Sequence, residues 1–204
     1  ALINSITGYK PANLVASASI DGHSNVAIMS SLVHIGSNPP LLALIFRPDH
    51  FRPDHFRPDT APRHTLANIR DTGVYTINHV HHDMIDAAHQ TAASYPRSVS
   101  EFAATGLTEH WQDGHAAPYV AEAVVRIGMQ LREEIPLSIN GTHMVIGEII
   151  YLEVPDGALN ELGALDPALA GGVAIAGLDS YYQCSLLQRM AYAKPDQTPK
   201  RLKA

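Results

Sequence analysis

The sequence predicts a mainly β protein, a barrel of antiparallel strands with a helical insertion around residues 64–104. Six or seven apolar segments have the length and alternation of strands, and most are separated by short turn signals. Helical periodicity is found only in the insertion. Because strands and helices do not alternate, the pattern favours a barrel over a parallel α/β sheet. The 204 residues suffice for one sizeable core, and we expect a single domain over residues 1–204.

The first predicted strands form a meander near the N-terminus. Small and apolar residues alternate in Leu14–Ile20, Asp21-Gly22 is a tight-turn signal, and Asn25–Met29 returns as the hairpin partner. Ser31–Ile35 is either a third strand or a bent continuation of the second. Leu41–Phe46 is apolar throughout, which is typical of a central strand.

The stretch from Asn25 to Pro40 has two interpretations. Its Ser30-Ser31 step places small side chains inside a β-rich run, where backbone amides could face a flat ligand. Alternatively, the two serines belong to a strand that crosses from the core to the surface. The pattern alone leaves both interpretations open.

A five-residue unit then recurs in tandem, as Phe-Arg-Pro-Asp-His at 46–50 and 51–55 and as Phe-Arg-Pro-Asp-Thr at 56–60. Proline in every copy excludes a regular ladder, and a period of five is too short for a solenoid unit. We interpret residues 46–60 as a loop that holds either a duplicated segment or an artefact of the recorded sequence. Its histidines and aspartates are expected to be solvated rather than metal-binding.

A helix is predicted to follow this loop over residues 66–73. Thr65 is a suitable N-cap residue and Gly73 a suitable helix end. Arg63 just before the helix would create an anion site, because free N–H groups, the helix dipole, a hydroxyl and a guanidinium would converge there. On this segment alone, an exposed arginine beside an ordinary cap is the simpler interpretation.

Four histidines lie in and after the next predicted strand, Val74–Val80, at positions 79, 81, 82 and 89. Residues 81–89 are predicted to form a helix that turns three apolar side chains inward (Met84, Ile85 and Ala88). The spacing of the histidines matches no closed zinc site, and adjacent His81 and His82 are expected on different helix faces. We therefore predict no metal site.

The second half of the chain is predicted to contain a long hairpin. Residues 123–135 and 142–154 alternate as strands, and Asn140-Gly141 is the turn. The glutamates on these strands are expected to be solvated or paired across the ladder rather than to form an acid/base pair (Glu133, Glu134 and Glu148). Before the hairpin we expect a loop and short helix over residues 94–102. After it we expect a helical turn at Leu159–Leu162, a glycine-rich loop from residue 171, and a flexible tail over about 190–204.

Composition argues against several classes of partner. The net charge is −6 with a pI near 6.0, and only the C-terminal tail is locally basic, so nucleic-acid binding is not expected. Cys184 is the single cysteine, which excludes an intrachain disulfide and fits a reducing compartment. No apolar run has the length of a membrane span, and no signal peptide is visible at the start. We expect a cytoplasmic protein that binds neither membrane nor nucleic acid.

No self-contained catalytic motif is present. The sequence lacks a dinucleotide-binding glycine fingerprint, a P-loop and a nucleophile elbow. Catalytic residues therefore stay unassigned. If the protein is an enzyme, a cofactor is expected to carry the chemistry.

Seven segments, in their order and spacing, resemble the flavin reductase-like family of FMN-binding split barrels. They are Lys10–Ser17, Ser24–Leu41, Arg63–Ile69, Tyr75–Val80, Ser94–Pro96, Glu101–Leu107 and Val145–Glu148. The resemblance extends from about Ile6 to Tyr182. Its main departure is the tandem repeat, where the family has one short loop.

The resemblance implies a split β-barrel of Greek-key type that forms a homodimer, with FMN (or else FAD) near the subunit interface. The backbone of Ser30-Ser31-Leu32 would meet the isoalloxazine edge, and Arg63 and Thr65 would hold the phosphate. Two triplets would line the remaining walls, namely Asn78-His79-Val80 and Ser94-Tyr95-Pro96.

The activity that the resemblance implies is an NAD(P)H:flavin reductase-like oxidoreductase. NADH or NADPH would be the reductant, and a small molecule or a protein would accept the electrons. Two rival interpretations are a flavin-binding protein without turnover and a metal- or haem-handling split barrel that uses the histidines.

Overall fold

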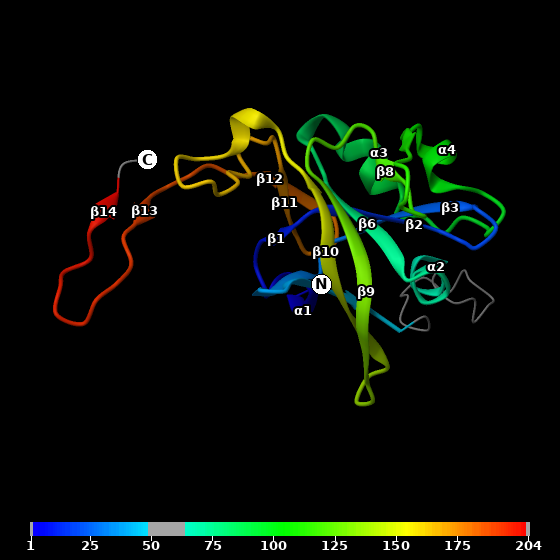
Figure 1. Ribbon diagram of the computed structural model, residues 1–204, viewed down its shortest axis with the longest axis horizontal. Coiled ribbons are helices and arrows are strands. Elements are labelled where there is room, and N and C mark those ends of the chain that lie inside the picture. Colours follow the sequence, from blue (N-terminus) through cyan, green and yellow to red (C-terminus); the bar gives the residue numbers. More distant parts are fainter. Residues whose placement is uncertain (1, 49–63, 203–204) are drawn as a thin grey trace.

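The computed structural model describes residues 2–48 and 64–202, and most of its elements are strands (Figure 1). The elements up to the helical insertion are α1 (Leu2–Ser5), β1 (Lys10–Pro11), β2 (Asn13–Ala18), β3 (Ser24–Met29), β4 (Leu32–Ser37) and β5 (Pro40–Phe46). The insertion holds α2 (His64–Thr72), β6 (Val74–His79), the 3-10 helix η1 (His82–Met84), α3 (Ile85–Gln90) and α4 (Glu101–Thr105). The remaining elements are β7 (Glu109–His110), β8 (Tyr119–Val120), β9 (Arg126–Leu137), β10 (Thr142–Glu153), the 3-10 helix η2 (Asp156–Ala158), β11 (Val173–Ala176), β12 (Ser180–Gln183), β13 (Arg189–Met190) and β14 (Arg201–Leu202).

Seven strands form one antiparallel sheet in the order β3-β2-β6-β9-β10-β5-β4. Its two edge strands, β3 and β4, are consecutive in the chain and are joined only by Ser30 and Ser31. The sheet therefore curves until its two ends meet at this link, which is how a barrel with a split wall is built. A smaller sheet, β1-β11-β12, extends the wall beyond β2.

The longest strands, β9 and β10, form the hairpin that the sequence predicts, with Gly141 in the turn at φ 71°. Two bulges interrupt the pairing and increase the twist that curves the sheet. Gly128 and Gly147 on these strands allow close packing, because the hydroxyls of Tyr119 and Tyr75 lie where a β-carbon would be.

The core has two parts, which lie on opposite faces of β2. Val15 points into the barrel and joins a cluster from β5, β6, β9 and β10, to which α2 contributes Leu66 and Ile69. Leu14 and Ala16 point the other way and join a cluster with α3 and α4. Both faces of β2 are therefore buried, and all its residues have little exposure. The helical insertion covers this wall of the barrel, since α2, α3 and α4 all contact β3.

The structure confirms the mainly β class and the helical insertion, and it corrects four local predictions. Thr65 is not the N-cap, because it lies inside α2. Leu41–Phe46 belongs to β5, which is one strand from the sheet edge rather than central. The turn expected at Leu159–Leu162 lies three residues earlier, in η2. Val173–Ala176, expected to be a loop because of its flanking glycines, is the strand β11.

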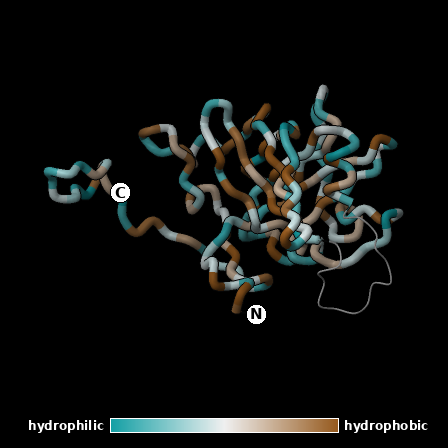
Figure 2. The backbone as a smooth tube through the Cα atoms, turned by 90° about the horizontal axis from the view of Figure 1, so that it is seen from below, coloured by the Kyte–Doolittle hydropathy of each residue, from teal (hydrophilic) through white to brown (hydrophobic). Residues whose placement is uncertain are grey.

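The C-terminal arm, residues 184–202, extends away from the barrel in two perpendicular views (Figures 1 and 2). The segment expected to be a flexible tail carries a short hairpin, β13 paired with β14. Leu187 and Tyr192 of the arm are 95% and 94% exposed. The tandem repeat lies, apart from its first residues, outside the described residues, as does Arg63. Among the helices of residues 2–48 and 64–202, none has the length and apolar character needed to cross a membrane.

Candidate functional site

The link between β3 and β4 places Ser30 and Ser31 where the two ends of the sheet meet. Both serines are half-buried, and the Ser31 carbonyl accepts a hydrogen bond from the Ile45 N–H at 3.0 Å. Within the described residues, the N–H groups of Ser30 and Ser31 donate no hydrogen bond. Leu32 begins β4 opposite Leu44 and packs on the barrel core. The link thus offers two free donors beside an apolar wall, as a polar ligand edge requires.

The opposite end of β3 holds a buried polar network. The Thr65 hydroxyl of α2 donates to Asn25 Oδ1 at 2.6 Å, and Asn25 Nδ2 donates to Glu101 Oε2 of α4 at 2.8 Å. The Val26 N–H also donates to Glu101 Oε2, at 3.4 Å. All three side chains are buried. The network fixes the first turn of α2 and the first turn of α4 to the same strand.

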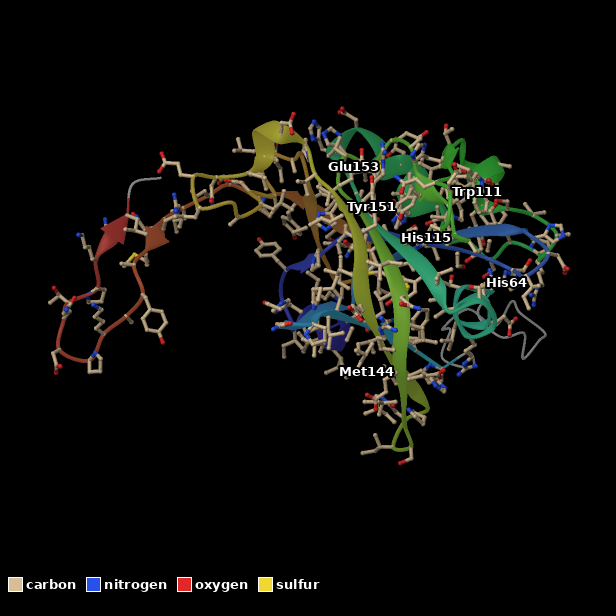
Figure 3. The ribbon with its side chains drawn as sticks, viewed as in Figure 1. His64, Trp111, His115, Met144, Tyr151 and Glu153 are labelled. Atoms are coloured by element: carbon tan, nitrogen blue, oxygen red, sulfur yellow. The ribbon has the colours of Figure 1, made fainter. Side chains whose placement is uncertain are left out.

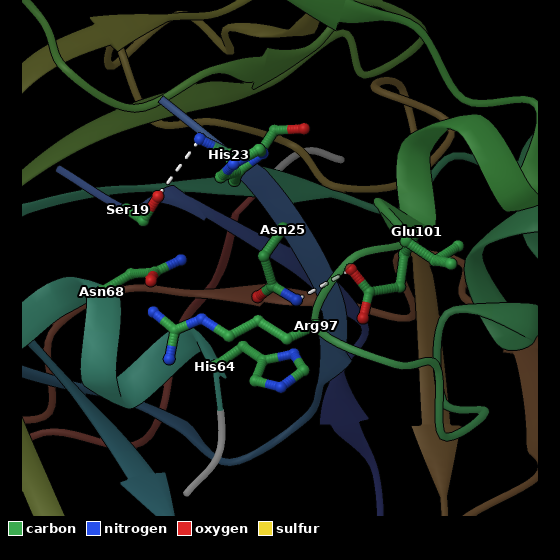
Figure 4. Close-up of a pocket in the computed structure, with 9 residues that line it drawn as sticks. Ser19, His23, Asn25, His64, Asn68, Arg97 and Glu101 are labelled. Atoms are coloured by element: carbon green, nitrogen blue, oxygen red, sulfur yellow. Dashed lines mark hydrogen bonds between the residues drawn. The ribbon is translucent and has the colours of Figure 1, made fainter. Parts of the chain in front are cut away.

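A small pocket, open to solvent, lies over this network (Figure 4). Its lining is polar, with Ser19, His23, Ser24, Asn25, His64, Asn68, Arg97 and Glu101 together with Val99. Arg97 and His64 bring donor groups to the first turn of α2, where backbone N–H groups carry partial positive charge. The pocket therefore offers donors to a small anion, and the Glu101 carboxylate that also lines it is held by Asn25 and the Val26 N–H. Arg97 directly follows the predicted triplet Ser94-Tyr95-Pro96, but nothing in the sequence distinguishes it from a surface arginine.

The triplet Asn78-His79-Val80 is mainly structural. The Asn78 side chain is fully buried, donates to Leu14 O at 3.1 Å and accepts from the Val120 N–H at 3.0 Å. Val80 is fully buried as well. His79 is the half-buried member, and burial lowers the pKa of its imidazole, so the ring is neutral near neutral pH. Of the three side chains, only His79 has surface left for a ligand.

The triplet Ser94-Tyr95-Pro96 lies in the loop between α3 and α4. The Tyr95 hydroxyl accepts a hydrogen bond from Gln90 Nε2 at 3.0 Å, which holds the ring against the end of α3. Ser94 and Pro96 are exposed. The loop leads directly to Arg97 and the pocket, so this triplet and Thr65 approach the same region.

Of the three strand glutamates, Glu134 and Glu148 are ion-paired and Glu133 is exposed, as the sequence predicts. Glu134 contacts Arg70 and His143, each at 2.5 Å, and Glu148 contacts Arg132 at 2.7 Å. The hydrogen bond from Arg70 holds the pKa of the Glu134 carboxyl below its usual range. Glu134 is therefore charged and paired near neutral pH and is not suited to act as a general acid, and the Glu148 carboxylate is engaged by Arg132.

An aromatic cluster packs against β9 and β10 (Figure 3). The Tyr119 ring lies 5.4 Å from that of His115 and 5.6 Å from that of Tyr151. Within the described residues, the buried Tyr119 hydroxyl and His115 Nε2 have no hydrogen-bond partner. Burial, Tyr151 and Glu153 raise the pKa of Tyr119 to about 12, so it exchanges no proton near neutral pH.

The expectation that His81 and His82 occupy different helix faces is wrong. His81 precedes η1 in an extended conformation, with φ −82° and ψ 151°, and caps it through its side chain. The two imidazole rings consequently stack with centroids 4.0 Å apart. The helical periodicity assumed for residues 81–89 does not apply at its first residue, which is why the sequence pattern gave the wrong geometry.

Comparison with known proteins gives one family and one fold. The family model described as "Flavin reductase like domain" matches residues 9–192. Uncharacterized proteins from Aquifex aeolicus and Halalkalibacterium halodurans are 27% and 24% identical over 154 and 174 residues. These alignments cover 74% and 82% of this chain and 72% and 78% of the relatives.

Two solved structures show the same architecture. A protein from Shewanella frigidimarina, named as a flavin reductase with a split barrel domain, is 43% identical with a TM-score of 0.86, covering 94% of this chain and 90% of that one. Nitrilotriacetate monooxygenase component B from Bacillus cereus is 20% identical with a TM-score of 0.79, covering 92% and 90%, and its likeness concerns the fold alone.

Proposed function

Because the chain belongs to the flavin reductase-like domain family, we propose that it is an FMN-dependent oxidoreductase that uses NADH or NADPH to reduce flavin. The family match extends over residues 9–192, so the resemblance noted in the sequence and the split-barrel fold are both confirmed. The electrons would pass to a small molecule or a protein. The alternative is that the protein binds flavin without turnover. The experiments below distinguish this alternative from a reductase.

The observation that supports this proposal most is the pairing of two different sites at the two ends of β3. Ser30 and Ser31 offer free N–H donors at one end, and the polar pocket over Asn25 offers an anion site at the other. Asn25 and Ser30 are five residue steps apart along the strand, which is about 17 Å. A ligand that uses both sites must be long, flat and polar at one end, and anionic at the other. FMN, with its ring, ribityl chain and phosphate, has that form.

The residues present fit FMN at both ends. The amides of Ser30 and Ser31 and the side of Leu32 would receive the ring edge, and Arg97, His64 and the first turn of α2 would hold the phosphate. The pocket is small, open and lined mostly by polar side chains, so it suits a phosphate better than the adenylate part of FAD. Thr65 would act through the backbone of its turn, because its hydroxyl is bonded to Asn25.

Bound FMN would supply the two-electron centre that accepts a hydride from a nicotinamide and passes the electrons on. The chain would contribute orientation and electrostatics. Reduction places negative charge on the pyrimidine edge of flavin, and N–H donors fixed at Ser30 and Ser31 would stabilise that charge without reorganising. Because His79 would be neutral, it would not place a second buried charge beside the negatively charged reduced flavin. Hydride transfer requires close positioning more than an acid or base, which fits the paired glutamates and the high pKa of Tyr119.

We also infer a homodimer, and the C-terminal arm supports it. A two-stranded hairpin is at best marginally stable alone in water, yet β13 and β14 stand away from the barrel and expose Leu187 and Tyr192. Residues 185–204 hold five of the fourteen basic residues and one of the twenty acidic residues, a net charge of +4. The remainder of the chain then carries −10. Charge complementarity therefore favours docking of the arm on the acidic body of a second copy.

The proposal is tested first by binding and reduction. Purified protein is titrated with FMN and with riboflavin, and the complex is then treated anaerobically with NADH or NADPH. Binding followed by loss of the oxidised-flavin spectrum supports a reductase. Binding without reduction by either nucleotide leaves the non-catalytic alternative, and failure to bind any flavin overturns both. A Soret band in the isolated protein would instead support the haem-handling alternative.

A substitution then tests the phosphate pocket. Arg97→Ala should weaken FMN by roughly tenfold to a hundredfold, the effect of losing one charge-assisted contact, and should leave riboflavin unchanged. Arg132→Ala is the matched control, since it removes an exposed arginine that pairs with Glu148 on β10. Equal weakening of FMN and riboflavin by Arg97→Ala would contradict the assignment of the pocket to the phosphate.

A further inference from the structure

We propose that His81, His82 and Asp83 form a binding site for a divalent transition-metal ion, with Zn²⁺ as the reference ion. The three residues lie where β6 passes into η1. Each offers one ligand atom, and these atoms lie within 4.8 Å of one another. The site uses none of the residues proposed above to hold flavin, so it goes beyond the reductase function and does not depend on it.

Backbone partners fix the tautomer of each histidine. His82 Nδ1 lies 3.2 Å from the Gly171 carbonyl oxygen, which can only accept, so Nδ1 carries the proton and Nε2 carries a lone pair. His81 Nδ1 accepts the Asp83 N–H at 3.3 Å, so the lone pair of His81 is on Nδ1. An ion bound at Nδ1 would replace this long hydrogen bond.

The two lone pairs face one carboxylate. His81 Nδ1 lies 3.4 Å from Asp83 Oδ2, and His82 Nε2 lies 3.3 Å from Asp83 Oδ1. With these tautomers, acceptors meet acceptors, and a cation among the three groups, either a proton or a metal ion, relieves their repulsion. The ligand atoms lie close enough together for one metal ion to bind all three residues.

The segment around Gly171 holds the imidazoles in place. The His82 N–H donates to Gly171 O at 3.0 Å, and His81 forms a bridge with Gly172. A β-carbon at Gly171 would overlap Nε2 of His81, so this atom is shielded and only Nδ1 can serve as a ligand. The carbonyl bond to His82 is the kind of outer contact that orients metal-binding histidines.

The side chains must close around the ion. With Zn–N bonds of about 2.0–2.1 Å in tetrahedral geometry, two ligand atoms lie about 3.3 Å apart. The widest separation within the 4.8 Å cluster must therefore shorten by up to roughly 1.5 Å. The side chains of His82 and Asp83 are 48% and 78% exposed and can rotate that far, and water can occupy the open positions. Two imidazoles and a carboxylate suit Zn²⁺, Ni²⁺ or Cu²⁺ rather than Mg²⁺ or Ca²⁺.

The experiment uses the full chain without a histidine tag, stripped of metal and titrated with ZnCl₂ by calorimetry. We expect one ion per chain. His82→Ala and Asp83→Asn should each weaken binding by at least about tenfold, because each removes one of three ligands. His89→Ala is the matched control, since His89 is another exposed histidine and bonds to Tyr181 rather than to the cluster. It should bind Zn²⁺ like the unchanged protein.

Two results would overturn the proposal. One is the absence of saturable Zn²⁺ binding. The other is binding that survives the double substitution of His82 and Asp83, which would assign the ion to other histidines. Nitrogen-detected NMR of the metal-free protein tests the physical basis separately. It should find the proton of His81 on Nε2 and that of His82 on Nδ1, and the opposite assignment would contradict the reasoning. Unchanged circular dichroism spectra of the variants would confirm that they fold.

Discussion

The Asn25 side chain should contribute more to the free energy of unfolding than a single neutral hydrogen bond does, because it joins two helices to β3. Asn25→Ala removes the bond from Thr65, worth about 1 kcal/mol, and the charge-assisted bond to Glu101, worth about 1.5–3 kcal/mol. It also leaves the Thr65 hydroxyl buried without its acceptor. The expected loss in unfolding free energy is therefore about 3 kcal/mol.

Asn68→Ala is the matched control. Asn68 is also a buried asparagine, but its side chain makes one neutral bond, to Ser17 Oγ at 3.2 Å. The same truncation there should cost about 1 kcal/mol. Because the loss of packing is common to both variants, the difference of about 2 kcal/mol isolates the connection to Thr65 and Glu101.

The assay is urea unfolding of flavin-free protein at one fixed concentration, followed by circular dichroism, because both ligand and self-association shift apparent stability. In thermal unfolding, a chain of this size should lose roughly 6–12 °C for Asn25→Ala and 2–4 °C for Asn68→Ala. If the two variants unfold alike, Asn25 does not connect the helices as described. If they differ as expected, Asn25→Ala should also weaken FMN more than riboflavin, because α2 would no longer be held at the pocket.

Three further predictions concern other parts of the chain. Glu134→Gln should destabilise the protein by at most about 1 kcal/mol at pH 7, because the pair with Arg70 is partly exposed. Because the folded-state pKa of Glu134 is depressed, its stabilisation is fully present above the unfolded pKa near 4.5 and is lost as the pH falls through the lower folded pKa, so both proteins should unfold alike in strong acid. A stability difference between the two proteins that persisted in acid would show that the charge of Glu134 is not its cause. Tyr119→Phe should leave the unfolding free energy unchanged or raise it, because the buried hydroxyl has no partner within the described residues; a loss above about 1 kcal/mol would reveal an ordered partner such as water. Deletion of residues 185–204 should shift the protein toward monomer in light scattering, and an unchanged mass would remove the role assigned to the arm.

The strands were predictable because their signals are local. The alternation on either side of Asn140-Gly141 specifies the long hairpin, and Asp21-Gly22 specifies the first one. β11 was missed for the same reason, since glycines before and after it are local signals for a loop. What makes it a strand is its pairing with β1, more than 160 residues earlier, at Lys10 and Ile175.

The candidate site was predictable only in part. The sequence drew attention to Ser30-Ser31, and the structure shows why a two-residue link matters there. It could not reveal the network over Asn25, whose partners Thr65 and Glu101 are 40 and 76 residues away. Arg97 has no local signature that separates it from other exposed arginines. Long-range contacts that a fold creates, rather than composition or periodicity, determine these groups.

The two serines between β3 and β4 have a consequence for aggregation. An open sheet has two edges whose unpaired N–H and C=O groups can recruit strands from other chains. Here both edge strands are joined to the same two-residue link, so neither edge can separate from the other without disrupting the wall of the barrel. A circular permutant cut between residues 30 and 31 could keep every ladder of the sheet, yet its edges would no longer be tethered. We expect such a permutant to fold with the same strand order and to aggregate more readily. The peptide bond between two small residues therefore protects solubility through connectivity alone.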